Sequence, residues 1–362
     1  MQLDKPESSA QNVGVILDGL SFASSSCFTI GRDTAMPFGA SLASVAGERN
    51  DDGTSTFPAA YVADTADANL DEVVRWISEN AESLVSQAAE TGAVLFRGFP
   101  IVTDKDFDAF ITAFGLPNFK YEDSLSNAVR VVRTERVFTA NEAPPDVRIC
   151  LHHEMAQTPV YPSRLFFFCE KAAEEGGETP LCRSDVLFDR MTREMPEFAA
   201  DCANKGLKYS HVMPAANDAA SGMGRSWQST LRSETKEQAE ERLRSLGYTW
   251  TWLDDGCLKV TTPVLQAVRQ LSNGKTAFFN QLIAAFHGWK DSRNDPTRSI
   301  TFGDGTPLDP ATMQRVIEMA EEITFDMRWQ NGDVVLVDNY VAMHGRRVFK
   351  GTRRVLASLV AS

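Results

Sequence analysis

The chain has 362 residues, of which 43% are hydrophobic, so it is long enough to bury a substantial core. Its 49 acidic and 36 basic side chains give a net charge of -13, which would repel a phosphate backbone and disfavours nucleic acid as a partner. No apolar run approaches the roughly 20 residues that a membrane-spanning helix needs, so we expect no membrane partner.

Residues 1–55 differ in composition from the rest of the chain. They are rich in Ser, Ala, Gly and Asp and show no sustained hydrophobic period, which indicates a partly disordered extension. Acidic residues such as Asp4 and Glu7 argue against an organellar targeting peptide, which is kept as the alternative. The six cysteines are scattered without a C-x-x-C pair, which favours reduced thiols and a cytoplasmic location. Residues 56–362 are predicted to form one domain.

Two amphipathic helices are predicted after residue 69. Apolar residues recur at three- and four-residue spacing from Leu70 to Ala88, and Gly92 is placed to end this helix. A short strand follows in AVLFRGF. The segment TDKDFDAFITAFG then predicts a second helix, capped by Thr103 or Asp104.

Short β-type runs separated by Gly, Pro and Asp dominate from residue 129 onward. Three helical stretches interrupt them, at 184–206, 235–247 and 309–322. The sequence therefore predicts an α+β, mainly β domain with flanking helices and helical insertions. The β-type runs are VRVV, RLFFFCE, YTWTWL, CLKVTTP, TAFFN, DVVLVDN and RRVLASLV.

The segment CLHHEMA, residues 150–156, places two of the five histidines beside a glutamate. If this segment is a strand, side chains two residues apart share a face, so His152 and Glu154 point together and His153 points away. A second histidine from elsewhere would complete the 2-His-1-carboxylate arrangement that suits non-haem Fe(II). We interpret His153 as a core side chain or a hydrogen-bond partner of a ligand.

The remaining ligand must come from His211, His287 or His344. His344 follows the buried-strand pattern DVVLVDNYVAM, and another β-run with Arg353 and Arg354 begins about ten residues later. A histidine at a strand end near an arginine on the next strand would supply both the third ligand and an anchor for an acidic cosubstrate. We therefore prefer His344.

From about Phe57 to the C-terminus the sequence resembles the clavaminate synthase-like branch of the TauD/TfdA family of Fe(II)- and 2-oxoglutarate-dependent dioxygenases. The resemblance implies a double-stranded β-helix, or jelly roll, with helices packed outside. It also implies oxidation of a small molecule with Fe(II), 2-oxoglutarate and O2, releasing succinate and CO2. The segments that carry it are GAVLFRGFP, RVFTANEAPPD, HHEMAQTPVYPSRLFFFCE, GGETPLCRS, ITFGDGTPL, GDVVLVDN and HGRRVFKGTRRVLASL.

The resemblance also implies roles for individual residues. The H-x-D/E motif of the family falls on His152 and Glu154, and its distal histidine on His344. The arginine that binds the distal carboxylate of 2-oxoglutarate falls on Arg354, and the threonine that assists it on Thr179.

Two positions narrow the expected reaction. Taurine dioxygenase-like members have a second arginine four residues after the anchor, and Ser358 stands there, which argues against a taurine-like sulfonate. Because Glu154 is a carboxylate, no coordination site is left for a halide. We therefore expect hydroxylation, desaturation or ring closure at a C–H bond of a small molecule, for example an amino acid derivative.

Five polar or aromatic residues near these motifs are candidates for the substrate pocket. We expect substrate contacts from Asn141 and Glu142, from Arg225 and Trp227, and from Asn280. For two of them a structural role is the alternative, because Asn141 can form an Asx turn and Trp227 can pack in the core.

Two other classes of function are kept as alternatives. A cupin-type isomerase, or a dioxygenase that needs no cosubstrate, would use the metal ligands without Arg354. A non-catalytic metal-binding protein on a jelly-roll fold is the second. The sequence specifies neither the substrate nor the oligomeric state.

Overall fold

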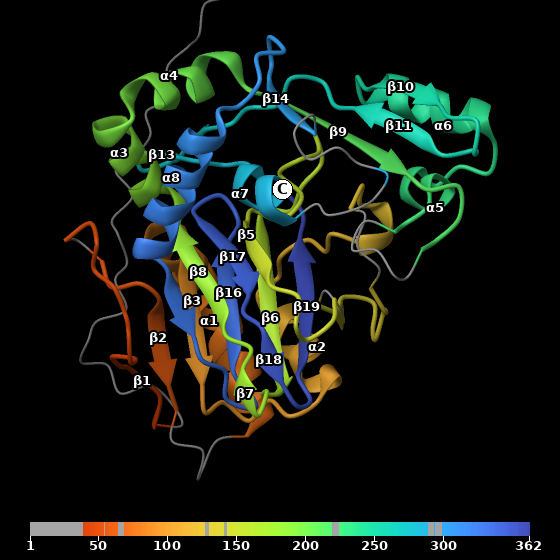
Figure 1. Ribbon diagram of the computed structural model, residues 1–362. Helices are drawn as coiled ribbons and strands as arrows, with labels where there is room; N and C mark the ends of the chain where they lie inside the picture. Colours follow the sequence, from red (N-terminus) through yellow and green to blue (C-terminus); the bar gives the residue numbers. More distant parts are fainter. Residues whose placement is uncertain are drawn as a thin grey trace, which may run out of the picture.

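The protein is built around two facing β-sheets, seen in the lower half of Figure 1. The computed structural model describes residues 39–53, 55–63, 69–126, 130–140, 143–218, 224–288, 293 and 299–362. The larger sheet has the strand order β1-β2-β3-β16-β6-β19-β4. Its strands are β1 (Ser41–Leu42), β2 (Ala59–Val62), β3 (Ala93–Arg97), β4 (Phe138–Thr139), β6 (Arg164–Lys171), β16 (Val334–Asp338) and β19 (Arg354–Val360).

The smaller sheet faces the larger one and has the order β15-β8-β17-β5. Its strands are β5 (Ile149–His152), β8 (Thr179–Arg183), β15 (Phe325–Met327) and β17 (Ala342–Arg346). Consecutive strands alternate between the two sheets, as in β5 to β6 or β16 to β17, and residues such as Phe167 and Leu181 fill the space between them. This is the jelly roll that the family resemblance implied.

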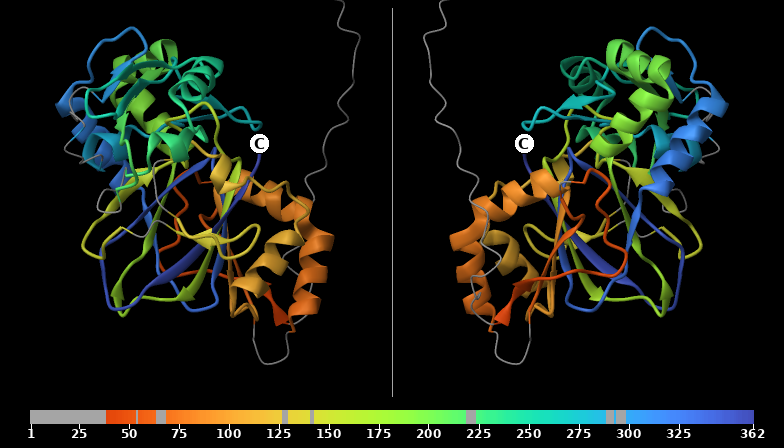
Figure 2. Two further views of the ribbon diagram at one scale, coloured as in Figure 1. Left: turned by 90° about the vertical axis from the view of Figure 1, so that its right-hand side faces the viewer. Right: turned by 90° about the vertical axis from the view of Figure 1, so that its left-hand side faces the viewer.

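Two helices cover the outer face of the larger sheet (Figure 2). Helix α1 (Leu70–Thr91) begins at the Asn69 cap and ends at Gly92, and α2 (Asp104–Thr112) begins with a capping box at Thr103, so both predicted helices are confirmed. Phe107 of α2 stacks on Phe168 of β6, with ring centroids 5.2 Å apart. The central strands of this sheet are therefore buried on both faces.

Residues between β8 and β15 form an insertion at one end of the jelly roll (Figure 1). Helices α3, α4, α7 and α8 pack there, beside a four-stranded sheet of order β10-β11-β9-β14. The bounds are α3 (Ser184–Glu194), α4 (Pro196–Lys205), β9 (Leu207–Met213), α5 (Trp227–Leu231), α6 (Lys236–Ser245), β10 (Thr249–Trp252), β11 (Leu258–Thr261), β12 (Arg269–Gln270), β13 (Thr276–Ala277), α7 (Leu282–Gly288), β14 (Ile300–Phe302) and α8 (Pro310–Glu322). Among the described helices, none is long and apolar enough to cross a bilayer. Two short strands, β7 (Glu175–Gly176) and β18 (Phe349–Lys350), pair at the other end.

The structure differs from the sequence-based boundaries in three places. Ordered chain begins before residue 55, because β1 pairs with β2 at the sheet edge; residues 1–38 lie outside the described part. In the run VRVV, the described residues 130–132 form only an isolated bridge, from Val132 to Phe138. The strand expected through 150–156 ends at His152, where the chain turns.

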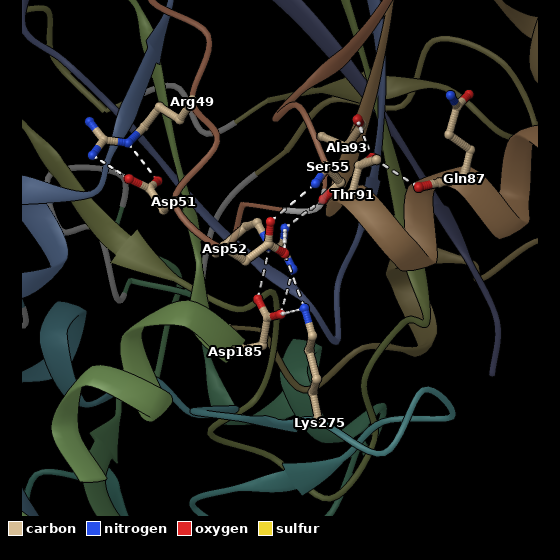
Figure 3. A network of polar contacts seen from close by, with 10 residues as sticks. Arg49, Asp51, Asp52, Ser55, Gln87, Thr91, Ala93, Asp185 and Lys275 are labelled. Carbon is tan, nitrogen blue, oxygen red and sulfur yellow. Dashed lines mark hydrogen bonds and ion pairs between the residues drawn. The ribbon is translucent and has the colours of Figure 1, made fainter. Parts of the chain in front are cut away.

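A cluster of charges attaches the N-terminal segment to the insertion (Figure 3). The Arg183 guanidinium lies 2.7 Å from an Asp52 carboxylate oxygen and 2.5 Å from one of Asp185. Lys275 adds a contact to Asp52 at 3.0 Å. Arg183 and Asp185 are almost fully buried, and each neutralises the charge of the other, which would be costly to bury without a partner.

Candidate metal centre

His152, Glu154 and His344 converge on one point inside the jelly roll. One ligand atom from each lies within 4.8 Å of the others. The cause is strand pairing: β17 runs antiparallel to β5 with His344 directly opposite His152, and their ring centroids are 4.3 Å apart. Phe167 from the facing sheet lies 5.1 Å from the His344 ring and closes the apolar side of the site.

Glu154 reaches the site from a turn and not from a strand. The same-face argument from the sequence selected His152 and Glu154, which do converge, but β5 ends at His152 and Met155 adopts a left-handed backbone with φ of 59°. The Asn339 side chain holds this turn, because its Oδ1 accepts from the Glu154 N–H at 2.8 Å and its Nδ2 donates to the Glu154 carbonyl at 3.1 Å. Asn339 thereby fixes the backbone that carries the carboxylate.

The two carboxylate oxygens of Glu154 have different partners. Oε2 lies 3.5 Å from Nε2 of His344 and 3.8 Å from Nε2 of His152. Oε1 accepts from Nη2 of Arg130 at 2.8 Å. Burial opposes ionisation of this carboxyl, but Arg130 and the two histidines hold its pKa well below the usual range. The group is therefore an anionic ligand.

Both histidines direct Nε2 toward the centre, where Oε2 of Glu154 lies. The Nδ1 of His152 donates to the Cys150 carbonyl at 2.8 Å, which orients the ring with Nε2 toward the centre. Burial lowers the pKa of His344 to about 4, so its imidazole is uncharged near neutrality. Oε2 of Glu154 lies 3.5 and 3.8 Å from the two imidazole nitrogens, and one ligand atom from each residue lies within 4.8 Å of the others, so the three can share one divalent ion.

His153 points away from this centre into the core, as the sequence predicted. Its ring nitrogens lie 2.5 Å from the Asn339 carbonyl oxygen and 3.1 Å from that of Phe278. Its ring contacts the Phe279 ring at 4.8 Å. Its role is to pack the turn against the neighbouring segments.

The expected cosubstrate residues are only partly brought together. Thr179 Oγ1 accepts from Trp329 Nε1 at 3.0 Å and from Arg353 Nη2 at 3.4 Å. Arg353 is half-buried and also donates to the Gly177 carbonyl at 2.9 Å. Arg354 points the other way: its side chain is 55% exposed and pairs with Glu170 at 2.5 Å. The structure therefore places Arg353, and not Arg354, beside Thr179.

The residues expected to line the substrate pocket have other partners. Arg225 donates to the carbonyl oxygens of Ser124 at 2.9 Å, Ser126 at 3.1 Å and Ser229 at 2.8 Å, so its guanidinium holds two backbone segments together. Trp227 packs edge-on against Trp252 in a hydrophobic cluster, which agrees with the core alternative.

Both polar atoms of the Asn280 side chain also form hydrogen bonds to nearby backbone groups. Its Nδ2 donates to the Ala267 carbonyl at 2.9 Å, and its Oδ1 accepts from the Leu282 N–H at 2.9 Å. Asn141 and Glu142 lie outside the described residues.

The fold and the donor set define a jelly-roll protein with a candidate 2-His-1-carboxylate metal site, and comparison with known proteins places it in a family. Residues 53–359 match the model for "Taurine catabolism dioxygenase TauD, TfdA family". The chain is 43% identical over 271 residues to a clavaminate synthase-like protein of Arabidopsis thaliana, covering 75% of this chain and 82% of the relative. The chain belongs to the TauD/TfdA family.

Two more distant matches extend over most of the chain. The dapdiamide synthesis protein DdaC of Enterobacter agglomerans is 26% identical over 312 residues, covering 82% of this chain and 89% of the relative. The crystal structure of a taurine dioxygenase from Burkholderia xenovorans aligns at 15% identity with a TM-score of 0.45, covering 84% of this chain and 87% of that one.

Proposed function

We propose that the protein is an Fe(II)- and 2-oxoglutarate-dependent dioxygenase that oxidises a C–H bond of a small molecule. The observation that carries this proposal is the convergence of His152, Glu154 and His344 in a member of the TauD/TfdA family. These three ligands occupy one face of an octahedral ion and leave three positions for the keto acid and O2. Bound Fe(II) would couple O2 activation to oxidative decarboxylation of 2-oxoglutarate, giving succinate and CO2.

In this proposal Arg353 takes the anchoring role that the family resemblance suggested for Arg354. Leu181 of β8 lies opposite His344, and Thr179 is two residues further along the same strand, roughly 6.6 Å at about 3.3 Å per residue. That separation suits a five-carbon diacid whose keto acid end is at the metal. Thr179 and Arg353 would then bind the distal carboxylate together.

The electrostatic state of Arg353 supports this assignment. Among the described residues, no carboxylate forms an ion pair with its guanidinium, and burial lowers its pKa to about 10. A partly buried cation without an anionic partner is costly, so a bound carboxylate would offset the desolvation. Arg354 already has a carboxylate partner and lies at the surface.

If Arg353 is the anchor, the family's second arginine, four residues further on, corresponds to Ala357 and not to Ser358. Four residues after Arg353 stands Ala357, which is buried in the core between the sheets. Ser358 belongs to the other side of β19, where Leu356 and Val360 pack under the helices. Neither residue is basic, so we do not propose a taurine-like sulfonate as the substrate. We propose hydroxylation, desaturation or ring closure as the reaction.

Anaerobic titration of the apoprotein with Fe(II) and then 2-oxoglutarate tests the proposal. We expect the weak visible charge-transfer band of a chelated keto acid, and succinate after O2 is admitted. His344→Ala, which removes a ligand, should show neither. Turnover of a substrate without 2-oxoglutarate would support a cosubstrate-independent enzyme. Metal binding with neither band nor succinate would support a non-catalytic protein.

A further inference from the structure

Arg130 places a positive charge directly against the metal ligands. Its Nη2 lies 2.8 Å from Oε1 of Glu154, and the two side chains are only 6% and 5% exposed. The guanidinium carbon lies 4.7 Å from the centre of the Tyr121 ring and 5.2 Å from that of Phe138. These two rings confine the guanidinium, so the ion pair has little freedom to move away from the metal centre.

The ion pair leaves Glu154 with one oxygen for a metal. Oε1 accepts from Arg130, while Oε2 faces Nε2 of both histidines. For Glu154 to coordinate through both oxygens, the charge-assisted hydrogen bond to Arg130 would have to break inside a buried site. One-oxygen coordination keeps three of the six positions of an octahedral ion open.

Arg130 also changes the charge of the centre. An imidazole that coordinates a metal is uncharged, so the charges of Glu154 and Arg130 cancel, and the ligand set lacks the single negative charge that two histidines and a carboxylate would otherwise supply. In the described part of the chain, Glu154 is the only carboxylate within ion-pair distance of Arg130. The buried Nε of Arg130 has no hydrogen-bond partner there either. The guanidinium charge is therefore shared between Glu154 and whatever binds at the open positions.

We propose that Arg130 is a positioning residue of the metal centre that acts in two ways. It restricts Glu154 to coordination through one oxygen, and its charge weakens binding of the bare divalent ion while favouring an anion at the open positions. The second effect on 2-oxoglutarate rests on the proposed function, whereas the effect on metal affinity does not.

The two effects have opposite signs, which separates them from simple damage to the site. Like charges a few ångströms apart in a protein interact with several times the thermal energy, so removing Arg130 should tighten metal binding by at least about tenfold. The same change removes an attraction for the keto acid carboxylate, so 2-oxoglutarate should bind the metal-loaded protein at least about tenfold more weakly. A disordered site would lose affinity for both.

The test uses calorimetric titration of the apoprotein with Mn(II), and then of the Mn(II)-loaded protein with 2-oxoglutarate, in mildly alkaline buffer. The informative variants are Arg130→Met, which keeps the packing between the two rings, and Arg130→Gln. Arg130→Lys retains the charge and should stay within about threefold of the wild type. Arg133→Gln is the matched control, because Arg133 is 40% exposed and its nearest ion-pair partner is Asp104.

A second measurement reports the coordination of Glu154 without any cosubstrate. Water-proton relaxation of the Mn(II)-loaded protein counts exchangeable waters on the metal. In Arg130→Met, the freed Oε1 can displace one of three waters, so the relaxivity should fall by about a third. Arg130→Lys and Arg133→Gln should keep the wild-type value.

The outcomes separate this proposal from the proposed function. Unchanged or weaker Mn(II) binding in both folded variants, Arg130→Met and Arg130→Gln, overturns the role of Arg130. If neither folds, an unchanged Mn(II) affinity and relaxivity in Arg130→Lys keeps the proposal, and a loss of more than tenfold in affinity overturns it. If Mn(II) binding tightens but no variant or wild type binds 2-oxoglutarate, the metal role stands and the dioxygenase proposal fails.

Discussion

Arg353 and Arg354 are adjacent in the chain, but their guanidinium groups have different partners, Thr179 for Arg353 and Glu170 for Arg354. Arg353 extends toward Thr179 and the Gly177 carbonyl, within the jelly roll. Arg354 extends outward to Glu170. Only one of them can therefore reach a diacid that chelates the metal, and the choice is testable.

Exchanging each arginine for methionine distinguishes the two. Arg353→Met should raise the dissociation constant of 2-oxoglutarate by about 10- to 100-fold, because one charge-assisted contact to a carboxylate contributes about 1.5–3 kcal/mol. Arg354→Met should leave it within about threefold, since an exposed ion pair contributes little. Calorimetric titration of the Mn(II)-loaded proteins measures both. The reverse pattern would return the anchoring role to Arg354.

There is a physical reason why the sequence alone could not distinguish Arg353 from Arg354 as the anchor. In a strand with one solvated face, alternation shows which residues point inward. Strand β19 has apolar residues on both faces, because Val355 and Ala357 face the smaller sheet while Leu356 packs beneath the helices. The alternation that would have identified Arg353 is therefore hidden by the helices on the outside.

Other parts of the structure show which features can be predicted from local sequence signals and which cannot. Helix α1 follows from its apolar spacing and its caps, which are local signals, and the H-x-E motif was found in the same way. Arg130 and Asn339 touch Glu154 from 24 and 185 residues away, respectively. No spacing rule joins positions that far apart, so these two partners required the fold.

Removing a metal ligand should abolish ion binding without unfolding the chain. His344→Ala leaves two donors on the centre, and we expect Mn(II) affinity to fall at least about hundredfold, since each ligand bond contributes several kcal/mol. His287→Ala is the control, because His287 is exposed at the end of α7. Calorimetry on the apoproteins measures both. Wild-type affinity in His344→Ala would exclude His344 as a ligand.

Asn339 should affect the metal through Glu154. Asn339→Ala removes both hydrogen bonds to the Glu154 backbone, and we expect Mn(II) affinity to fall by about 10- to 100-fold, as for other residues that orient metal ligands. The control is Asn331→Ala, because Asn331 accepts from the Ala172 N–H in an exposed loop. If both variants bind Mn(II) like the wild type, Asn339 holds the turn without positioning the ligand.

The buried charge cluster makes a prediction about stability. Asp185→Ala leaves Arg183 buried with only Asp52 as an anionic partner, so we expect the free energy of unfolding to fall by about 3 kcal/mol. Asp189→Ala breaks the pair with Arg193 on the surface, where both side chains are more than 60% exposed, and should change stability by less than about 0.5 kcal/mol. Urea unfolding of the apoproteins compares the two. Equal losses of stability in the two variants would show that burial does not determine the cost of removing the carboxylate.

The stability of the protein should fall in acid partly through His211, away from the metal centre. His211 lies in β9 opposite Val260 of β11, and burial lowers its pKa from 6.5 to about 4. Because the folded-state pKa is below the unfolded one, the unfolded chain takes up the proton first. The stability that uncharged His211 contributes is therefore fully present above about pH 6.5 and is lost as the pH falls toward 4. At about 1.4 kcal/mol per pH unit, the loss amounts to about 3 kcal/mol.

His211→Gln should remove this part of the acid sensitivity. Urea unfolding of metal-free wild type and variant at neutral pH and near pH 4.5 should show a smaller loss of stability for the variant. Val260→Ala is the matched control: it lowers stability by creating a cavity in the same strand pair, by a similar amount at both pH values. A variant that loses as much stability in acid as Val260→Ala would assign the acid sensitivity to other buried groups.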